Sequence, residues 1–151
     1  MANKTQGPRA GFGLRLLHLG RLWRQAVDAE IQRGTFSGAG WRALLWLGRS
    51  GERLRQKDLA ALMGIEGPSL VRLLDGLCAG GLLRREPDAE DRRAYRLILT
   101  DEGRATVSRI EARLAAIEQD LLDGLSDAEL APCAAVLERL EAKLQAQRGG
   151  R

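Results

Sequence analysis

The sequence predicts a mainly α protein with four helices, one β-hairpin and two further helices, in the order α-α-α-α-β-β-α-α. Two observations predict this order. Apolar residues recur at helical spacing along most of the chain, and glycines interrupt them at the intervals that separate short helices. Between Leu82 and Leu99 the pattern changes to two strand-like segments joined by a charged loop, which is typical of a hairpin.

Length and composition fit one globular domain. The chain has 151 residues, of which 44% are hydrophobic, and its formal charge of +4 permits a nucleic-acid partner without demanding one. Most of the positive charge is arginine, which suits phosphates and guanine edges, although a base-composition bias in the coding sequence explains the same excess. No apolar run approaches the ~18 residues that span a bilayer, and no secretion signal is recognisable, so we expect a cytoplasmic protein without a membrane partner.

Apolar stripes predict the first two helices. Residues 1–10 are expected to form a disordered lead. The first helix runs from Leu14 to a glycine stop at Gly34. Ser37 is expected to cap a second helix whose buried stripe lies between residues 41 and 47, and a break is expected at residues 48–51.

The next two helices have the dimensions of a helix-turn-helix. They are predicted over Gln56–Met63 and Pro68–Ala79, with a short link that begins at Gly64. Ser69 and Arg72 project from one side of the second helix near its N-terminal end, where such helices meet base edges in a DNA groove. The opposite side is apolar and is expected to be buried: Leu70, Val71, Leu74, Leu77 and Cys78. Taken alone, Arg72 serves equally well as a solvated residue beside an acidic neighbour.

The predicted hairpin strengthens the DNA-binding interpretation. Its strands are expected at residues 82–86 and 94–99, with arginines in the strands and the loop: Arg84, Arg85, Arg92, Arg93 and Arg96. Acidic residues are mixed among them, so the excess of positive charge is small. A loop of Asp91-Arg92-Arg93 directly after a recognition-type helix is more specific. An arginine there can enter the narrow minor groove, and Asp91 can hold its guanidinium ready.

Two long helices complete the chain. Thr100 is expected to cap the first of them. Apolar residues in both follow a spacing of three and four, which suits a seam against a partner helix. The first set is Val107, Ile110, Leu114, Ile117 and Leu121, and the second set is Leu130, Cys133, Leu137, Leu140 and Leu144. Each set spans about two heptads, so it indicates a helical bundle.

These residues together resemble the MarR family of winged helix-turn-helix transcriptional regulators, and its SlyA-like branch in particular. The resemblance is carried by Gly64-Ile65-Glu66-Gly67-Pro68-Ser69-Leu70-Val71-Arg72, by Gly81-Leu82-Leu83 with Arg85, by Asp91-Arg92-Arg93, and by Leu99-Thr100 with Gly103. Leu22-Trp23-Arg24-Gln25-Ala26-Val27-Asp28 also resembles the first helix of that branch. The match covers nearly the whole chain in the same order.

The resemblance implies a homodimer that binds a near-palindromic operator in double-stranded DNA. Residues 35–103 would form the winged helix-turn-helix, and residues 11–34 and 104–148 would form the dimerisation region. The implied DNA-binding residues are Gln56, Pro68, Ser69, Arg72, Asp91, Arg92, Arg93 and Arg96. The family also implies release by a small aromatic or apolar anionic effector, for which His18, Trp23 and Trp41 are candidate pocket residues. No cofactor is expected.

Other functions have weaker support. His18 is the single histidine and the two cysteines match no metal spacing, so neither a zinc site nor a serine triad is expected. Gly11-Phe12-Gly13 follows no predicted strand and is not a dinucleotide loop. We therefore expect no enzymatic activity. The alternative is a winged-helix adaptor that binds proteins and has little specific affinity for DNA.

Overall fold

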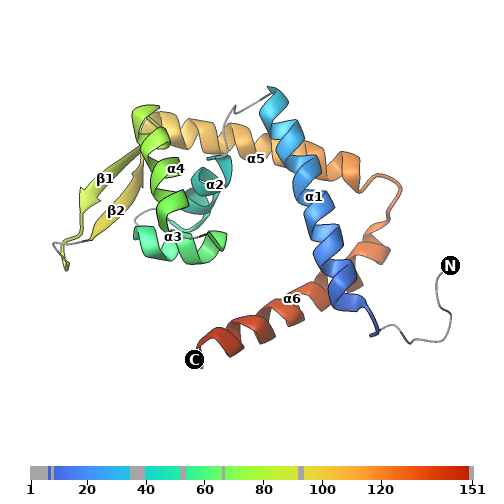
Figure 1. Ribbon diagram of the computed structural model, residues 1–151. Helices are drawn as coiled ribbons and strands as arrows, with labels where there is room; N and C mark the ends of the chain where they lie inside the picture. The colour runs from blue at the N-terminus through green and yellow to red at the C-terminus, as the bar shows by residue number, and fades with distance from the viewer. Residues whose placement is uncertain are drawn as a thin grey trace. The chain divides into compact units, whose positions relative to one another are not determined.

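The computed structural model describes residues 7, 9–34, 40–51, 54–65, 67–91 and 94–149 (Figure 1). The elements follow the predicted order: α1 (Phe12–Gly34), α2 (Trp41–Arg49), α3 (Gln56–Met63), α4 (Gly67–Ala79), β1 (Leu83–Pro87), β2 (Tyr95–Leu99), α5 (Asp101–Leu121) and α6 (Asp127–Gly149). The described residues thus form a mainly helical winged helix-turn-helix with one two-stranded antiparallel sheet, as predicted. Two compact units make up the chain, Met1–Ile117 and Glu118–Arg151.

Glycines in the left-handed region end α3 and α4, as the sequence predicts. Gly64 has a φ of +63° and donates its amide to Ala60 O at the end of α3. Gly81 has a φ of +70°, and the next amide, Leu82 N, donates to Leu77 O at 3.0 Å. Such bonds satisfy carbonyl groups that a helix end otherwise leaves unpaired. Gly64 therefore marks the start of the link between α3 and α4, and Gly81 marks the start of the segment that leads into the hairpin.

The predicted break after the second helix occurs later than expected. Helix α2 continues through Gly48 to Arg49, and Gly51, with a φ of +78°, lies in the turn that follows. A β-carbon on Gly48 would lie 2.8 Å from Val107 Cγ1 of α5. Gly48 therefore permits close packing of α2 on α5 and does not end the helix. The expected cap, Ser37, lies outside the described residues.

One core joins the helices of the first unit to the hairpin. Its buried members are Val27, Ile31, Trp41, Ala43, Leu44, Leu47, Leu59, Leu70, Leu74, Leu77, Leu83, Leu97, Leu99, Val107, Ile110 and Ile117. Three of the predicted heptad residues of α5, Val107, Ile110 and Ile117, thus pack inside their own chain. The spacing correctly indicated an apolar face, but these three residues are buried by their own chain and not by a partner helix.

The hairpin is attached to the helices by main-chain bonds as well as by its apolar side chains. Leu83 pairs with Leu99 at the start of the register, and Pro87 pairs with Tyr95 near the loop. The chain that leads into α3 adds a short antiparallel bridge at Arg55, and Leu97 N donates to Leu54 O at 2.9 Å. Strand β2 is therefore bonded, near the loop end of the hairpin, to the residues just before α3.

The second unit begins near the end of α5 and contains α6. Glu129 caps the start of this helix with its side chain: Ser126 N and Ser126 Oγ both donate to Glu129 Oε2, at 2.9 and 2.7 Å. These bonds lower the pKa of Glu129. Of the second predicted heptad set, Leu137 and Leu144 are 49% and 61% exposed, so this face is left largely uncovered in the single chain. In the described parts of the chain, no helix is both long and apolar enough to cross a membrane.

Candidate nucleic-acid interface

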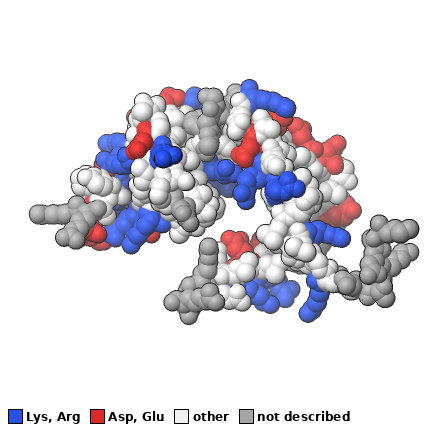
Figure 2. Space-filling view, viewed as in Figure 1, with Lys and Arg blue, Asp and Glu red and all other residues white. Residues whose placement is uncertain are grey.

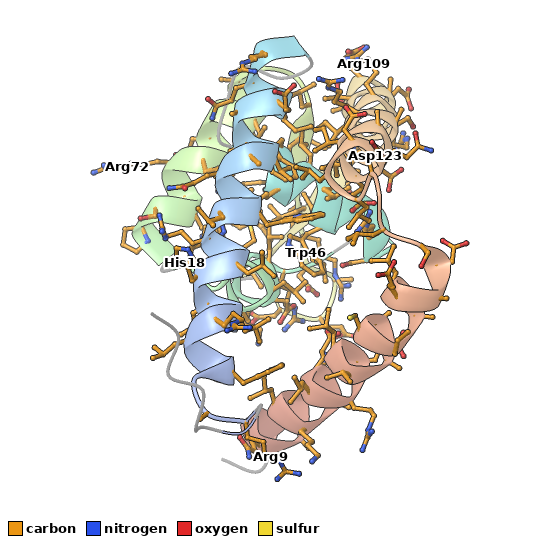
Figure 3. The ribbon with its side chains drawn as sticks, turned by 90° about the vertical axis from the view of Figure 1, so that its right-hand side faces the viewer. Arg9, His18, Trp46, Arg72, Arg109 and Asp123 are labelled. Carbon is orange, nitrogen blue, oxygen red and sulfur yellow. The ribbon has the colours of Figure 1, made fainter. Side chains whose placement is uncertain are left out.

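Helix α4 has polar, exposed residues near its N-terminal end and buried apolar residues along its opposite side. Leu70, Leu74 and Leu77 are buried, so this side of the helix is fixed in the core. Ser69 and Arg72 are exposed, and Arg72 extends away from the helix into solvent (Figure 3). The two residues are three positions apart and therefore lie on one face near the N-terminal end. Pro68 is also exposed, so all three residues are open to solvent, and their role in DNA binding stays a prediction.

One expected core residue of α4 is not buried. Val71 is 38% exposed, although it was expected on the apolar side of the helix. Leu73 packs against the core in its place. Cys78 is half-buried and also contacts the core, as expected for a packed thiol.

Helix α3 begins at Gln56, which is half-buried. The residue before it, Arg55, has an extended backbone and provides no side-chain cap. A helix start of this kind keeps amide groups available, and the positive end of the helix dipole favours phosphate oxygens. Gln56 is thus placed where a phosphate contact is chemically suitable.

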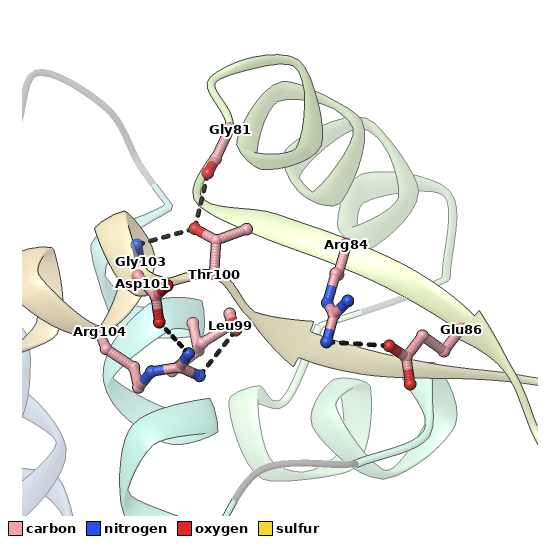
Figure 4. Close-up of polar contacts among 8 residues, drawn as sticks. All are labelled: Gly81, Arg84, Glu86, Leu99, Thr100, Asp101, Gly103 and Arg104. Atoms are coloured by element: carbon pink, nitrogen blue, oxygen red, sulfur yellow. Dashed lines mark hydrogen bonds and ion pairs between the residues drawn. The ribbon is translucent and has the colours of Figure 1, made fainter.

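The arginines of the hairpin strands are already engaged within the chain. Arg85 Nη1 donates to Asp75 Oδ1 of α4 at 2.7 Å, and Arg84 pairs with Glu86 at 3.0 Å (Figure 4). In the loop, Asp91 is exposed and its carbonyl accepts the amide of residue 94 at 2.9 Å. Arg92, which was expected to enter the minor groove, and its neighbour Arg93 lie outside the described residues. Figure 2 shows basic side chains over α3, α4 and the hairpin, with acidic side chains among them.

The most strongly held charge in this region was not singled out by the sequence. Asp88 has no exposed side-chain surface, and its Oδ2 accepts from Arg55 Nε at 2.7 Å and pairs with Arg96 Nε at 3.0 Å. Its other oxygen accepts from Glu90 N at 2.8 Å. Hydrogen bonds from Arg55 and from the Glu90 amide, together with Arg96, hold the pKa of Asp88 well below its usual range. The same carboxylate raises the pKa of Arg55.

Arg96 therefore has a place that the sequence did not predict. It was expected among the DNA-binding residues, and in the structure its side chain is half-buried and directed to Asp88. No periodic signal marks this cluster, because Arg55 and Asp88 are 33 positions apart. An aspartate that follows a proline in a charged loop resembles any other turn residue.

The end of the hairpin opposite its loop is joined to α4 and α5 through Thr100 (Figure 4). Thr100 Oγ1 donates to Gly81 O at 2.7 Å and accepts the amide of Gly103 at 3.0 Å. The predicted cap of α5 is thus confirmed, and the same hydroxyl also bonds to the carbonyl of Gly81 in the turn after α4. Arg104 donates to Leu99 O at 2.9 Å and pairs with Asp101.

The candidate effector residues do not share one setting. His18 is exposed on α1 and its Nδ1 lies 3.3 Å from Arg21 Nη2 (Figure 3). Trp23 is half-buried against the core. Trp41 is 6% exposed and donates from Nε1 to Asp28 Oδ1 of α1 at 3.0 Å. Trp41 is consequently a core residue that joins α1 to α2.

Within the described residues, no three histidine, cysteine or acidic side chains are grouped so that they could hold a metal ion. Cys78 and Cys133 are free thiols. The polar groups that the structure places in this region are the exposed Ser69 and Arg72 on α4, the start of α3 and the arginines of the hairpin strands.

Comparison with known proteins gives one family match and three similar structures. A model of the MarR family matches residues 36–94. The structure of the transcriptional regulator PA3341 is 41% identical to this chain, covers 89% of it and 98% of its own length, and has a TM-score of 0.78. An E. coli MarR mutant complexed with operator DNA is 21% identical, with coverages of 83% and 91% and a TM-score of 0.69. The structure of the transcriptional regulator SlyA is also 21% identical, with coverages of 87% and 94% and a TM-score of 0.71. The last two share the fold of this chain.

Proposed function

The chain belongs to the MarR family of transcriptional regulators, and from this premise we propose that it is a sequence-specific DNA-binding regulator that acts as a homodimer on a near-palindromic operator. The observation that carries the proposal is the exposed face of α4. Ser69 and Arg72 project from a helix whose other side is buried, so the backbone that carries them is ordered before any partner binds. A backbone that is already ordered loses little entropy on binding, which favours specific recognition.

Each part of the interface has a proposed role. Arg72 forks onto a guanine edge in the major groove, and Ser69 bonds to a base or a phosphate. Gln56 contacts a phosphate at the start of α3. The hairpin loop contacts the minor groove through Arg92. The DNA-binding residues of the proposal are Gln56, Pro68, Ser69, Arg72, Asp91, Arg92, Arg93 and Arg96, and they belong to a DNA-binding region of residues 35–103.

Dimerisation is assigned to residues 11–34 and 104–148. Apolar side chains on the first half of α1 are uncovered in the single chain, with Leu14 and Leu17 exposed by 75% and 73%. Uncovered apolar surface on this scale favours association with a second chain. Two copies of α4, related by a two-fold axis and about one DNA turn apart, would then read the two halves of a palindrome.

The proposal includes release from DNA by a small aromatic or apolar anionic effector. His18, Trp23 and Trp41 remain its candidate pocket residues, with Trp41 acting through its bond to Asp28 of α1. Loss of the DNA complex when aromatic acids are added would support this part, and an unchanged complex across a panel of such acids would contradict it.

Selection of duplexes from a random pool tests the central claim. Wild-type protein should enrich one palindromic sequence with a dissociation constant of about 10 nM or tighter. Arg72→Ala should bind that sequence about 5- to 150-fold more weakly and discriminate less at one position. Arg109→Ala, which removes the same charge from α5, serves as the control and should retain affinity. No enrichment by the wild type, or equal binding of all sequences, would favour the adaptor function instead.

A further inference from the structure

Among the described residues, Asp88 is the one charged residue that is buried. It lies at the base of the hairpin loop, and three donors from three places in the chain converge on it. Arg55 comes from the segment before α3, Arg96 comes from β2, and the amide of Glu90 comes from the loop itself. A buried carboxylate loses its hydration, and only a complete set of donors offsets that cost.

Main-chain bonds join the same two segments beside the cluster. Arg55 forms an antiparallel main-chain β-bridge with Arg96, and Leu97 N donates to Leu54 O at 2.9 Å. These bonds define where the hairpin meets the start of α3. Both arginine side chains would repel one another across that junction without the carboxylate between them. Glu90, 3.6 Å from Arg55 Nη2, is 79% exposed and cannot replace Asp88.

We propose that Asp88 is a positioning residue for DNA binding, which holds the hairpin at a fixed angle to α3 so that the hairpin and α3–α4 meet DNA as one rigid surface. This inference rests on the proposed function. Asp88 does not touch the DNA itself, because its side chain has no exposed surface. Buried ion pairs are a weak source of stability, and in some proteins they serve to define geometry, which is the role proposed for Asp88.

The consequence for binding is entropic. A hairpin whose loop end is free to move must be ordered each time DNA binds, and this loss of entropy weakens the complex. With Asp88 in place, this order exists before binding. Loss of the carboxylate should therefore weaken DNA binding while the core and the α4 surface remain intact.

The test uses the full-length protein and the duplex selected by the wild type. Asp88→Asn keeps the shape and removes the charge, and should weaken binding about tenfold. Arg72→Ala should cost the same factor in the wild-type and Asp88→Asn backgrounds, because α4 is anchored separately. Glu102→Gln, which removes an exposed paired carboxylate from α5, is the matched control and should bind like the wild type.

Amide exchange in the absence of DNA gives a second reading. The Leu97 amide should exchange faster in Asp88→Asn, whereas amides in the middle of α4 should keep their protection. If Asp88→Asn does not fold, Arg55→Ala replaces it, since that change leaves Arg96 and the Glu90 amide on the carboxylate. Unchanged Leu97 exchange, or affinity within twofold of the wild type in a folded variant, would overturn the proposal.

The two proposals fail in different ways. If wild-type protein selects no duplex, the proposed function fails and the role of Asp88 in DNA binding falls with it. If the wild type binds and Arg72→Ala weakens binding, but Asp88→Asn changes neither affinity nor Leu97 exchange, only the positioning role is wrong.

Discussion

Gly103→Ala should destabilise the protein, although alanine is normally the better helix residue. Gly103 lies in the first turn of α5, and a β-carbon built there would be 2.1 Å from Leu82 O and 3.4 Å from Leu99 Cδ2. An ordinary contact between carbon and a carbonyl oxygen is about 3.3 Å, so the strand junction must move by about 1 Å. That carbonyl also accepts the amide of Thr100 at 3.2 Å, so the movement disturbs an existing bond.

The expected magnitude follows from three contributions. Overpacking costs about 1–3 kcal/mol, weakening of the Thr100 N bond costs about 1 kcal/mol, and the change from glycine to alanine inside a helix returns about 1 kcal/mol. The net loss is about 1–3 kcal/mol in the free energy of unfolding, which lowers the Tm of a chain of this size by about 2–12 °C. Protein concentration must be held constant, because association shifts apparent stability.

Gly76→Ala is the matched control. Gly76 also lies inside a helix, but nothing is within 4 Å of the β-carbon that alanine would add. Its substitution should therefore stabilise the protein by up to about 1 kcal/mol. Urea unfolding of both variants checks the opposite signs. If Gly103→Ala is as stable as Gly76→Ala, the close approach of α5 to the hairpin is not a constraint, and the reasoning is refuted.

Three further predictions follow from polar contacts. Thr100→Val should lower the free energy of unfolding by about 1–2 kcal/mol, because both hydrogen bonds of the Thr100 hydroxyl are lost. Thr100→Ser keeps the hydroxyl and should retain most of the wild-type stability. A Val variant as stable as the wild type would contradict this prediction. Trp41→Phe should cost about 1–3 kcal/mol, because Asp28 loses the indole donor. Asp28→Ala removes the acceptor, so Trp41→Phe should cost less in an Asp28→Ala background in a double-mutant cycle; an equal cost in both backgrounds would contradict this. Folding lowers the pKa of Asp88, so the stabilising contribution of its carboxylate is complete above the unfolded pKa of about 4 and is lost as the pH falls. The difference in the free energy of unfolding between wild type and Asp88→Asn should therefore shrink between about pH 5 and pH 2. A difference that does not depend on pH would contradict this prediction.

The sequence predicted those features that depend on neighbouring residues. Gly64 and Gly81 end their helices because glycine adopts positive φ without strain, and this preference is visible in the sequence itself. Thr100 caps α5 for a similarly local reason. The MarR family and the winged-helix fold are confirmed as well, because long motifs with fixed order identify them.

Features that depend on distant residues were missed or misjudged. Gly48 was taken as a helix break, and its actual reason is the proximity of Val107, 59 positions later. Heptad spacing in α5 indicated an apolar face but not whether that face packs on its own chain or on another. Asp88 gave no signal, because a buried carboxylate is defined by the arginines that reach it and not by its neighbours in sequence.

The hairpin is held at three points, and these points differ in their sensitivity to salt. The pair of Arg85 with Asp75 is partly exposed and will be screened at high ionic strength. The buried Asp88 cluster and the Thr100 bonds will persist, because they are shielded from solvent or carry no net charge. The hairpin should therefore stay in place while contacts to phosphates weaken. A steep loss of DNA affinity with salt would then count the phosphate contacts and would not report the release of the hairpin.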